Sequence, residues 1–149
     1  YYNRNFGTNI KILRLSQVIG NDRNGYLISR YTENAAEGKP LAVYGNSVGK
    51  RDYIYVKDAC RAIWLSLQKY ALCGVYNIGS GTGTTNLELA KAIIDGFHSS
   101  SDVEMQRDKK EDTSVCYLDI TKAKNDLGFV CQYSLSEAFG ELCNEKWGV

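Results

Sequence analysis

The chain has 149 residues, 44% of them hydrophobic, and its 18 basic and 17 acidic side chains leave a net charge of +1. This length predicts one domain. There is no basic stripe that could neutralise many phosphates and no long apolar run, so neither nucleic acid nor a membrane is expected as a partner. The five cysteines lack C-x-x-C spacing and His98 is the single histidine. Free thiols in a reducing cytoplasm are therefore expected rather than a zinc site.

The first half of the chain predicts strands that alternate with helices. Residues 10–15 (I-K-I-L-R-L) are typical of a buried strand. Residues 26–37 predict a helix that buries Leu27, Ile28, Tyr31 and Ala35 and ends at Gly38. A short strand at 41–44, a polar loop at 45–50 and a second strand at 52–56 follow.

The next helix is expected over residues 58–69, with Asp58 as its N-cap and with Ala59, Ala62, Ile63, Ser66 and Leu67 facing inward. A strand at 75–78 precedes the loop G-S-G-T-G. The pair Thr85 and Glu88 predicts a capping box for a helix that runs to Phe97. A strand at 103–106, a charged loop at 108–112 and helices at 121–127 and 136–147 complete an α/β pattern.

Arg51 is the most informative single residue, because a loop delivers it just before a buried strand. A guanidinium at the mouth of a strand can grip a diphosphate through its planar fork, and Tyr53, two residues on, faces the same side. The alternative is that Arg51 is a solvated loop charge paired with Asp52.

Four motifs in order resemble one protein family. Residues 51–62 (R-D-Y-I-Y-V-K-D-A-C-R-A) resemble the R-D-[FY]-[IV]-[HY]-V-x-D signature of extended short-chain dehydrogenases/reductases, the NAD-dependent epimerase/dehydratase family. Residues 12–20 are similar to its L-R-x-x-N-x-x-G strand. Residues 76–90 are similar to its Y-N-[IL]-G-x-G-x-x-x-[ST] loop, and residues 117–129 to its D-x-[ST]-K-A-x-x-x-L-G-[FW] segment. The set covers nearly the whole chain.

The resemblance implies the C-terminal part of a Rossmann-type fold together with its small α/β substrate-binding domain. In the family, the dinucleotide-binding glycines and the catalytic Tyr-x-x-x-Lys precede the L-R-x-x-N strand. Residues 1–149 are therefore expected to be a C-terminal substrate-binding portion, inactive alone, of a protein that binds NAD mainly through its N-terminal part.

Two local patterns imitate the family's catalytic features. Tyr53 and Lys57 have the spacing of the catalytic pair, but they span a strand and its exit instead of one helix face. Gly79, Gly81 and Gly83 follow a strand and precede a helix, but Thr84 breaks G-x-G-x-x-G, so a tight turn is the expected role.

The resemblance also implies ligand contacts. Gln17 stands where the family has an asparagine that hydrogen-bonds the sugar diphosphate, and Glu111 stands where it has a glycine. For Glu111 and Lys109, a solvated charged loop competes with ligand contact. The implied substrate-binding residues are Gln17, Leu27, Tyr44, Arg51, Tyr53, Lys109 and Asp112, and Ser16 is the implied cofactor contact.

The expected function is that of a nucleotide-sugar epimerase whose partner is a nucleoside-diphosphate sugar and which forms a homo-oligomer. A dehydratase, decarboxylase or reductase of the same family is the first alternative. A non-catalytic nucleotide-binding module is the alternative from another class.

Overall fold

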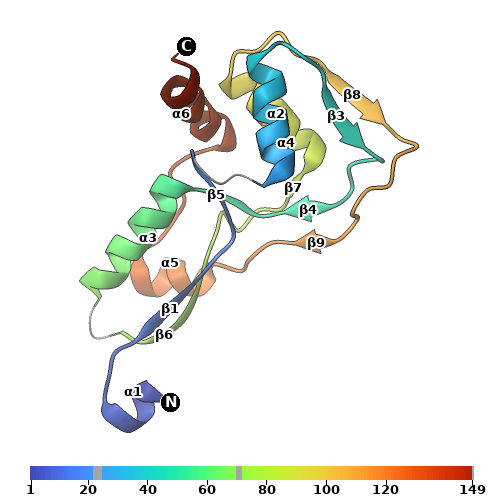
Figure 1. The fold of residues 1–149 in the computed structure, drawn as a ribbon. Helices are drawn as coiled ribbons and strands as arrows, with labels where there is room; N and C mark the ends of the chain where they lie inside the picture. Colours follow the sequence, from blue (N-terminus) through green and yellow to red (C-terminus); the bar gives the residue numbers. More distant parts are fainter. Residues whose placement is uncertain (22–24, 70–71, 149) are drawn as a thin grey trace.

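A computed structural model describes residues 1–21, 25–69 and 72–148 of the chain. The elements form two packed groups joined by a small three-stranded sheet (Figure 1). One group lies beside the N-terminus of the chain, and the other contains the C-terminus. Each group has its own cluster of buried apolar side chains. No helix in the described ranges is long and apolar enough to cross a membrane.

The first group is built on two parallel strands. The short helix α1 (Tyr2–Phe6) leads into β1 (Lys11–Leu15), which pairs in parallel with β6 (Gly74–Ile78). The helices α3 (Val56–Gln68) and α5 (Thr121–Leu127) pack against this pair. Tyr76 and Ile78 are buried there with Phe129, so the apolar positions of β6 face the two helices.

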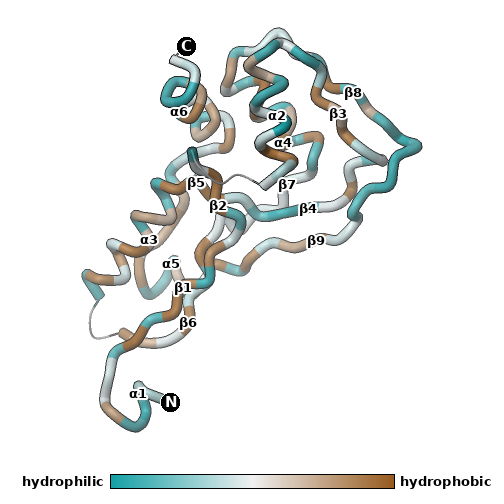
Figure 2. The backbone as a smooth tube through the Cα atoms, in the orientation of Figure 1, coloured by the Kyte–Doolittle hydropathy of each residue, from teal (hydrophilic) through white to brown (hydrophobic). Residues whose placement is uncertain are grey.

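The second group packs three helices beside a parallel strand pair. Helix α2 (Tyr26–Ala36) buries the predicted face, and β3 (Leu41–Tyr44) pairs with β8 (Val103–Gln106). Helix α4 (Asn86–Gly96) crosses α6 (Leu135–Trp147) where Gly96 meets Gly140. A side chain at Gly96 would clash with the backbone of α6, so this close crossing requires glycine. Figure 2 shows hydrophobic segments in both packed groups and a hydrophilic loop after β8.

Strand β5 (Tyr53–Tyr55) joins the two clusters. It pairs in parallel with β2 (Gln17–Ile19) and is buried on both faces. Tyr53 and Tyr55 belong to one apolar cluster and Ile54 to the other, as the alternation of side chains along a strand requires. The residues on either side of β5 are therefore held rigidly at the junction.

The three-stranded sheet carries the polar residues of the junction. Strand β4 (Lys50–Arg51) runs antiparallel to β7 (Thr84–Thr85) and parallel to β9 (Val115–Cys116). The capping box of α4 forms as predicted, because Thr85 accepts from the Glu88 amide and Glu88 accepts from the Thr85 amide. This sheet brings residues near 50, 84 and 115 together.

Two predictions about α3 are wrong. Asp58 is not the N-cap, because the helix begins at Val56; its buried carboxylate accepts from the backbone amides of Gln132 and Tyr133 instead. Ile63 and Leu67 are 46% and 68% exposed although they were expected inward. The other residues expected to face inward, Ala59, Ala62 and Ser66, are buried.

Candidate functional site

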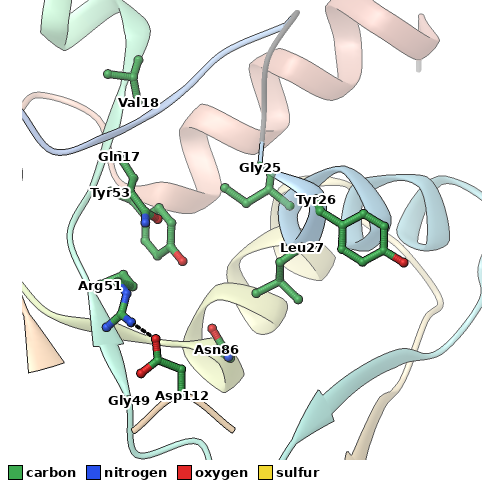
Figure 3. A pocket seen from close by; sticks show the side chains of 11 residues that line it. Gln17, Val18, Gly25, Tyr26, Leu27, Gly49, Arg51, Tyr53, Asn86 and Asp112 are labelled. Atoms are coloured by element: carbon green, nitrogen blue, oxygen red, sulfur yellow. Dashed lines mark hydrogen bonds and ion pairs between the residues drawn. The ribbon is translucent and has the colours of Figure 1, made fainter. Parts of the chain in front are cut away.

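A cavity of about 520 Å³ lies at the junction between the two packed groups. It is bounded by β2, the start of α2, β4, β5, the start of α4 and the segment before β9 (Figure 3). Its volume is in the range of small-molecule sites in proteins. The residues that line it are Gln17, Val18, Gly25, Tyr26, Leu27, Ile28, Gly49, Arg51, Tyr53, Asn86 and Asp112.

Five of the seven predicted substrate-binding residues line this cavity: Gln17, Leu27, Arg51, Tyr53 and Asp112. The other two are not among its lining residues in the described part of the chain. Tyr44 lies at the end of β3, where the Arg30 guanidinium sits 5.7 Å from the centre of its ring. Lys109 is exposed in the charged loop.

The Arg51 guanidinium is held by the segment before β9. Nη1 donates to the carbonyl oxygen of Ser114 at 2.6 Å and to that of Lys50 at 2.9 Å. Nη2 donates to the Ser114 hydroxyl at 2.7 Å and forms an ion pair with Asp112 (Figure 3). The alternative considered from sequence, that Arg51 pairs with Asp52, is wrong, because the Asp52 carboxylate accepts hydrogen bonds from residues 80, 81 and 118 instead. The cavity thus has a fixed cation beside a carboxylate.

Asp52 organises the glycine-rich loop. It is 4% exposed, and its carboxylate accepts from the Ser80 amide and hydroxyl at 2.8 and 2.7 Å. It also accepts from the amides of Gly81 and Leu118. The loop amides that could bind a phosphate are therefore occupied by a carboxylate of the same chain. The described residues do not fit a dinucleotide pyrophosphate at this loop, in agreement with the tight-turn interpretation.

Glu111 was expected either to face the ligand or to be solvated, and both expectations are wrong. Its two carboxylate oxygens accept from four consecutive backbone amides, those of residues 46 to 49, at 2.6 to 3.0 Å. These hydrogen bonds, of which the one from Gly49 has the largest effect, lower the pKa of Glu111 below its ordinary value. Sequence patterns gave no signal for this contact, which spans more than sixty residues.

Tyr53 presents its hydroxyl to the cavity while its ring is buried (Figure 3). Burial raises the pKa of Tyr53 above its ordinary value, and the nearby charge of Arg51 partly offsets this effect. The phenol is therefore neutral at physiological pH and can donate a hydrogen bond.

A smaller cavity of about 260 Å³ adjoins the first and shares Gln17 and Arg51 with it. Ser16, the predicted cofactor contact, lines this cavity with Cys116 and Tyr117. The Ser16 hydroxyl is buried and has no hydrogen-bond partner among the described residues. A buried hydroxyl without a hydrogen-bond partner is unfavourable, and a bound ligand could supply that partner.

The order of motifs and the α/β architecture agree with comparisons to known proteins. Residues 1–79 match the sequence model of the NAD dependent epimerase/dehydratase family. The match covers more than half of the chain, and the chain belongs to this family. Its fold is that of the Rossmann-type extended short-chain dehydrogenases/reductases.

Curated relatives come from several activities of the family. The chain is 35% identical, over 78% of its length, to a low-salt glycan biosynthesis protein of Haloferax volcanii, of which it covers 37%. It is 34% identical, over 77% of its length, to a dTDP-glucose 4,6-dehydratase of Streptomyces niveus, of which it covers 34%. The chain therefore spans about a third of the length of these relatives.

Solved structures match almost the whole chain. UDP-N-acetylglucosamine 4-epimerase from Bacillus cereus superposes with a TM-score of 0.82 at 33% identity, covering 99% of this chain and 49% of that one. UDP-glucuronic acid 4-epimerase from Bacillus cereus, solved with UDP-glucuronic acid and NAD, gives a TM-score of 0.74 at 25% identity, with coverages of 99% and 48%. The chain spans about half of each.

Proposed function

We propose that residues 1–149 are the C-terminal, substrate-binding portion of an NAD-dependent nucleotide-sugar epimerase. One observation carries the proposal: five residues implied by the family motifs come from separate elements and line a single cavity. Side chains brought together from distant parts of the sequence around one concave surface are typical of a ligand site. The match to a UDP-N-acetylglucosamine 4-epimerase over 99% of this chain supports the epimerase activity.

Each of these five lining residues has a chemical role in this proposal. The Arg51 fork binds the diphosphate, and the neutral Tyr53 hydroxyl donates to a phosphate oxygen. Leu27 packs against the base, and Asp112 accepts from the ribose hydroxyls. Gln17 hydrogen-bonds the sugar side of the diphosphate. Together these contacts hold the nucleotide and leave the sugar beside the smaller cavity, so that binding energy far from the reacting carbon positions that carbon.

The phosphate must share or replace existing partners of Arg51. Both terminal nitrogens of the guanidinium are engaged by the chain itself, and only Nε is without a partner among the described residues. We expect phosphate oxygens to replace the Asp112 carboxylate at Nη2. The released carboxylate would then be available to the ribose. The ion pair thus serves as a placeholder that keeps the fork oriented before the ligand arrives.

NAD would supply the hydride chemistry of the complete protein. The described residues form no dinucleotide cradle, so we propose that NAD is held mainly by residues outside this chain, with Ser16 as a contact from this side. The 149 residues contain no helical Tyr-x-x-x-Lys, since Tyr53 lies in β5 and Lys57 in α3. The isolated chain should therefore turn over no nucleotide-sugar.

A dehydratase is the second candidate, because a dTDP-glucose 4,6-dehydratase is 34% identical to the matched segment. A decarboxylase is supported less, by a UDP-glucuronic acid decarboxylase of Arabidopsis thaliana at 27% identity. The full-length protein should be incubated with NAD and UDP- or dTDP-sugars, and the products identified by NMR. An inverted hydroxyl supports epimerisation and a 4-keto-6-deoxy sugar supports dehydration. Binding without any turnover would support a nucleotide-binding module instead.

A further inference from the structure

We propose that Glu111 is a positioning residue for the nucleotide site: its carboxylate clamps the loop of residues 46–49 and thereby fixes Arg51 and Asp112 at the cavity wall. This inference rests on the proposed function, because it assigns Arg51 and Asp112 to ligand binding. Glu111 itself does not line the cavity. It acts through the backbone on either side of it.

The geometry around Glu111 is that of an anion site filled by the chain's own carboxylate. The amides of Asn46 and Ser47 donate to Oε2 at 2.6 and 2.8 Å, and those of Val48 and Gly49 donate to Oε1 at 2.6 and 3.0 Å. Consecutive amides that converge in this way form a concave nest for an anion. The hydrogen bonds are charge-assisted, which makes them stronger than ordinary backbone bonds.

The loop is shaped to accept this carboxylate. Gly45 and Ser47 both have left-handed backbone conformations, with φ of +65° and +56°. A side chain at Gly45 would clash with the Glu111 side chain, and a side chain at Gly49 would clash with the carbonyl of Asp112. The two backbones therefore touch at this place, and the loop can wrap around Glu111 only with glycine at both ends.

The clamp connects directly to the two ligand-binding charges. Gly49 ends the nest, lines the cavity and is two residues from Arg51. Asp112 follows Glu111 and pairs with Arg51, so the nest and the ion pair form two successive cross-links between the same two segments. A third link holds the loop to α4, because the Leu87 amide donates to the Ser47 hydroxyl at 2.7 Å. The loop therefore retains an anchor when Glu111 is replaced.

Removing the carboxylate should free the amides of residues 46–49 and let the Arg51 side chain move, without removing any ligand contact. Glu111→Ala in the full-length protein should lower the affinity for UDP by about tenfold, as expected for residues coupled through a shared backbone. Glu111→Gln keeps one acceptor oxygen and should lose less. Asp108→Ala removes a carboxylate from the same loop at an exposed position and should leave the affinity unchanged.

A double-mutant cycle with Arg51→Ala tests the proposal. If Glu111 acts through Arg51 and Asp112, the loss caused by Glu111→Ala should become clearly smaller once Arg51 is gone, because only the contribution through Asp112 remains; the melting temperature shows that both variants fold. Equal losses in the presence and absence of Arg51, or no loss for Glu111→Ala beside a clear loss for Arg51→Ala, would overturn the inference alone. No loss of UDP affinity for Arg51→Ala itself would overturn the proposed function.

Discussion

Arg51 and Asp112 form an ion pair at the wall of the main cavity although 61 positions separate them in the chain. The pair is partly exposed: the Arg51 side chain is 25% and the Asp112 side chain 68% accessible. Such a pair adds little to stability. Because both partners are predicted ligand contacts that line the cavity, we propose that the pair keeps the guanidinium oriented until a phosphate arrives.

We proposed that phosphate displaces the Asp112 carboxylate from Arg51. This exchange predicts that Asp112→Asn changes the affinities for the phosphate part and the ribose part of the ligand in opposite directions. Asp112→Asn removes the charge that competes for Arg51 and also weakens the acceptor for the ribose. Pyrophosphate, which has no ribose, should bind about two- to fivefold more tightly to the variant, the amount expected for a partly screened pair. Uridine, which has no phosphate, should bind less tightly. Titration calorimetry with both ligands measures the split, and a change of the same sign for both would contradict the exchange.

Asp52 predicts a structural effect at a buried position. Asp52→Asn presents an amide nitrogen to donors that now meet a carboxylate, so at least one of its bonds to Ser80, Gly81 or Leu118 is lost. The free energy of unfolding should fall by about 2–4 kcal/mol in urea titrations. Asp102→Asn, at an exposed carboxylate, should change it by no more than about 0.5 kcal/mol. Equal changes in the free energy of unfolding for the two variants would show that the Asp52 contacts do not contribute to stability.

The helices and strands were largely predictable because their signals are local. The capping box at Thr85, the helix over residues 121–127 and the inward face of α2 follow from neighbouring residues, and the structure confirms them. The predicted set of ligand contacts came from the family motifs, and five of its members line one cavity.

The contacts that shape the site were not predictable, because their partners are far apart in sequence. Asp52 was considered as a partner of Arg51, yet it binds a loop 28 to 29 positions away and Leu118 beyond it. Asp58 was predicted to be an N-cap because it stands near the start of a helix, but its carboxylate accepts hydrogen bonds from the amides of residues 132 and 133. A carboxylate beside a hydrophobic run has the same local pattern in either role. Strand β9 has only two residues and no periodicity to detect.

Tyr31 predicts a pH dependence of stability in the alkaline range. Burial raises the pKa of Tyr31 from 10.0 to about 12, and its hydroxyl donates to the carbonyl of Ala42 at 2.9 Å. The folded state thus keeps the proton that the unfolded state loses. The stabilisation is complete below pH 10.0 and is lost as the pH rises toward about 12.

The variant Tyr31→Phe cannot ionise, and it should be less stable than the wild type at neutral pH by about 1 kcal/mol. Between the two pKa values, its free energy of unfolding should fall less steeply than that of the wild type. Over the whole range the wild type should lose about 2–3 kcal/mol more than the variant. Other tyrosines with raised pKa values contribute equally to both proteins and cancel in the comparison. Urea titrations across this range measure the difference, and parallel curves for the two proteins would contradict it.

The most direct test of the central claim is a calorimetric titration of UDP and uridine against the full-length protein and its Arg51→Lys and Arg51→Ala variants. A lysine keeps the charge but not the planar fork, so UDP affinity should fall for Arg51→Lys and fall further, at least about tenfold, for Arg51→Ala. Uridine carries no phosphate and should bind all three proteins almost equally. Equal affinities for UDP across the three proteins would remove Arg51 from the ligand site and contradict the assignment of this cavity to a nucleotide-sugar.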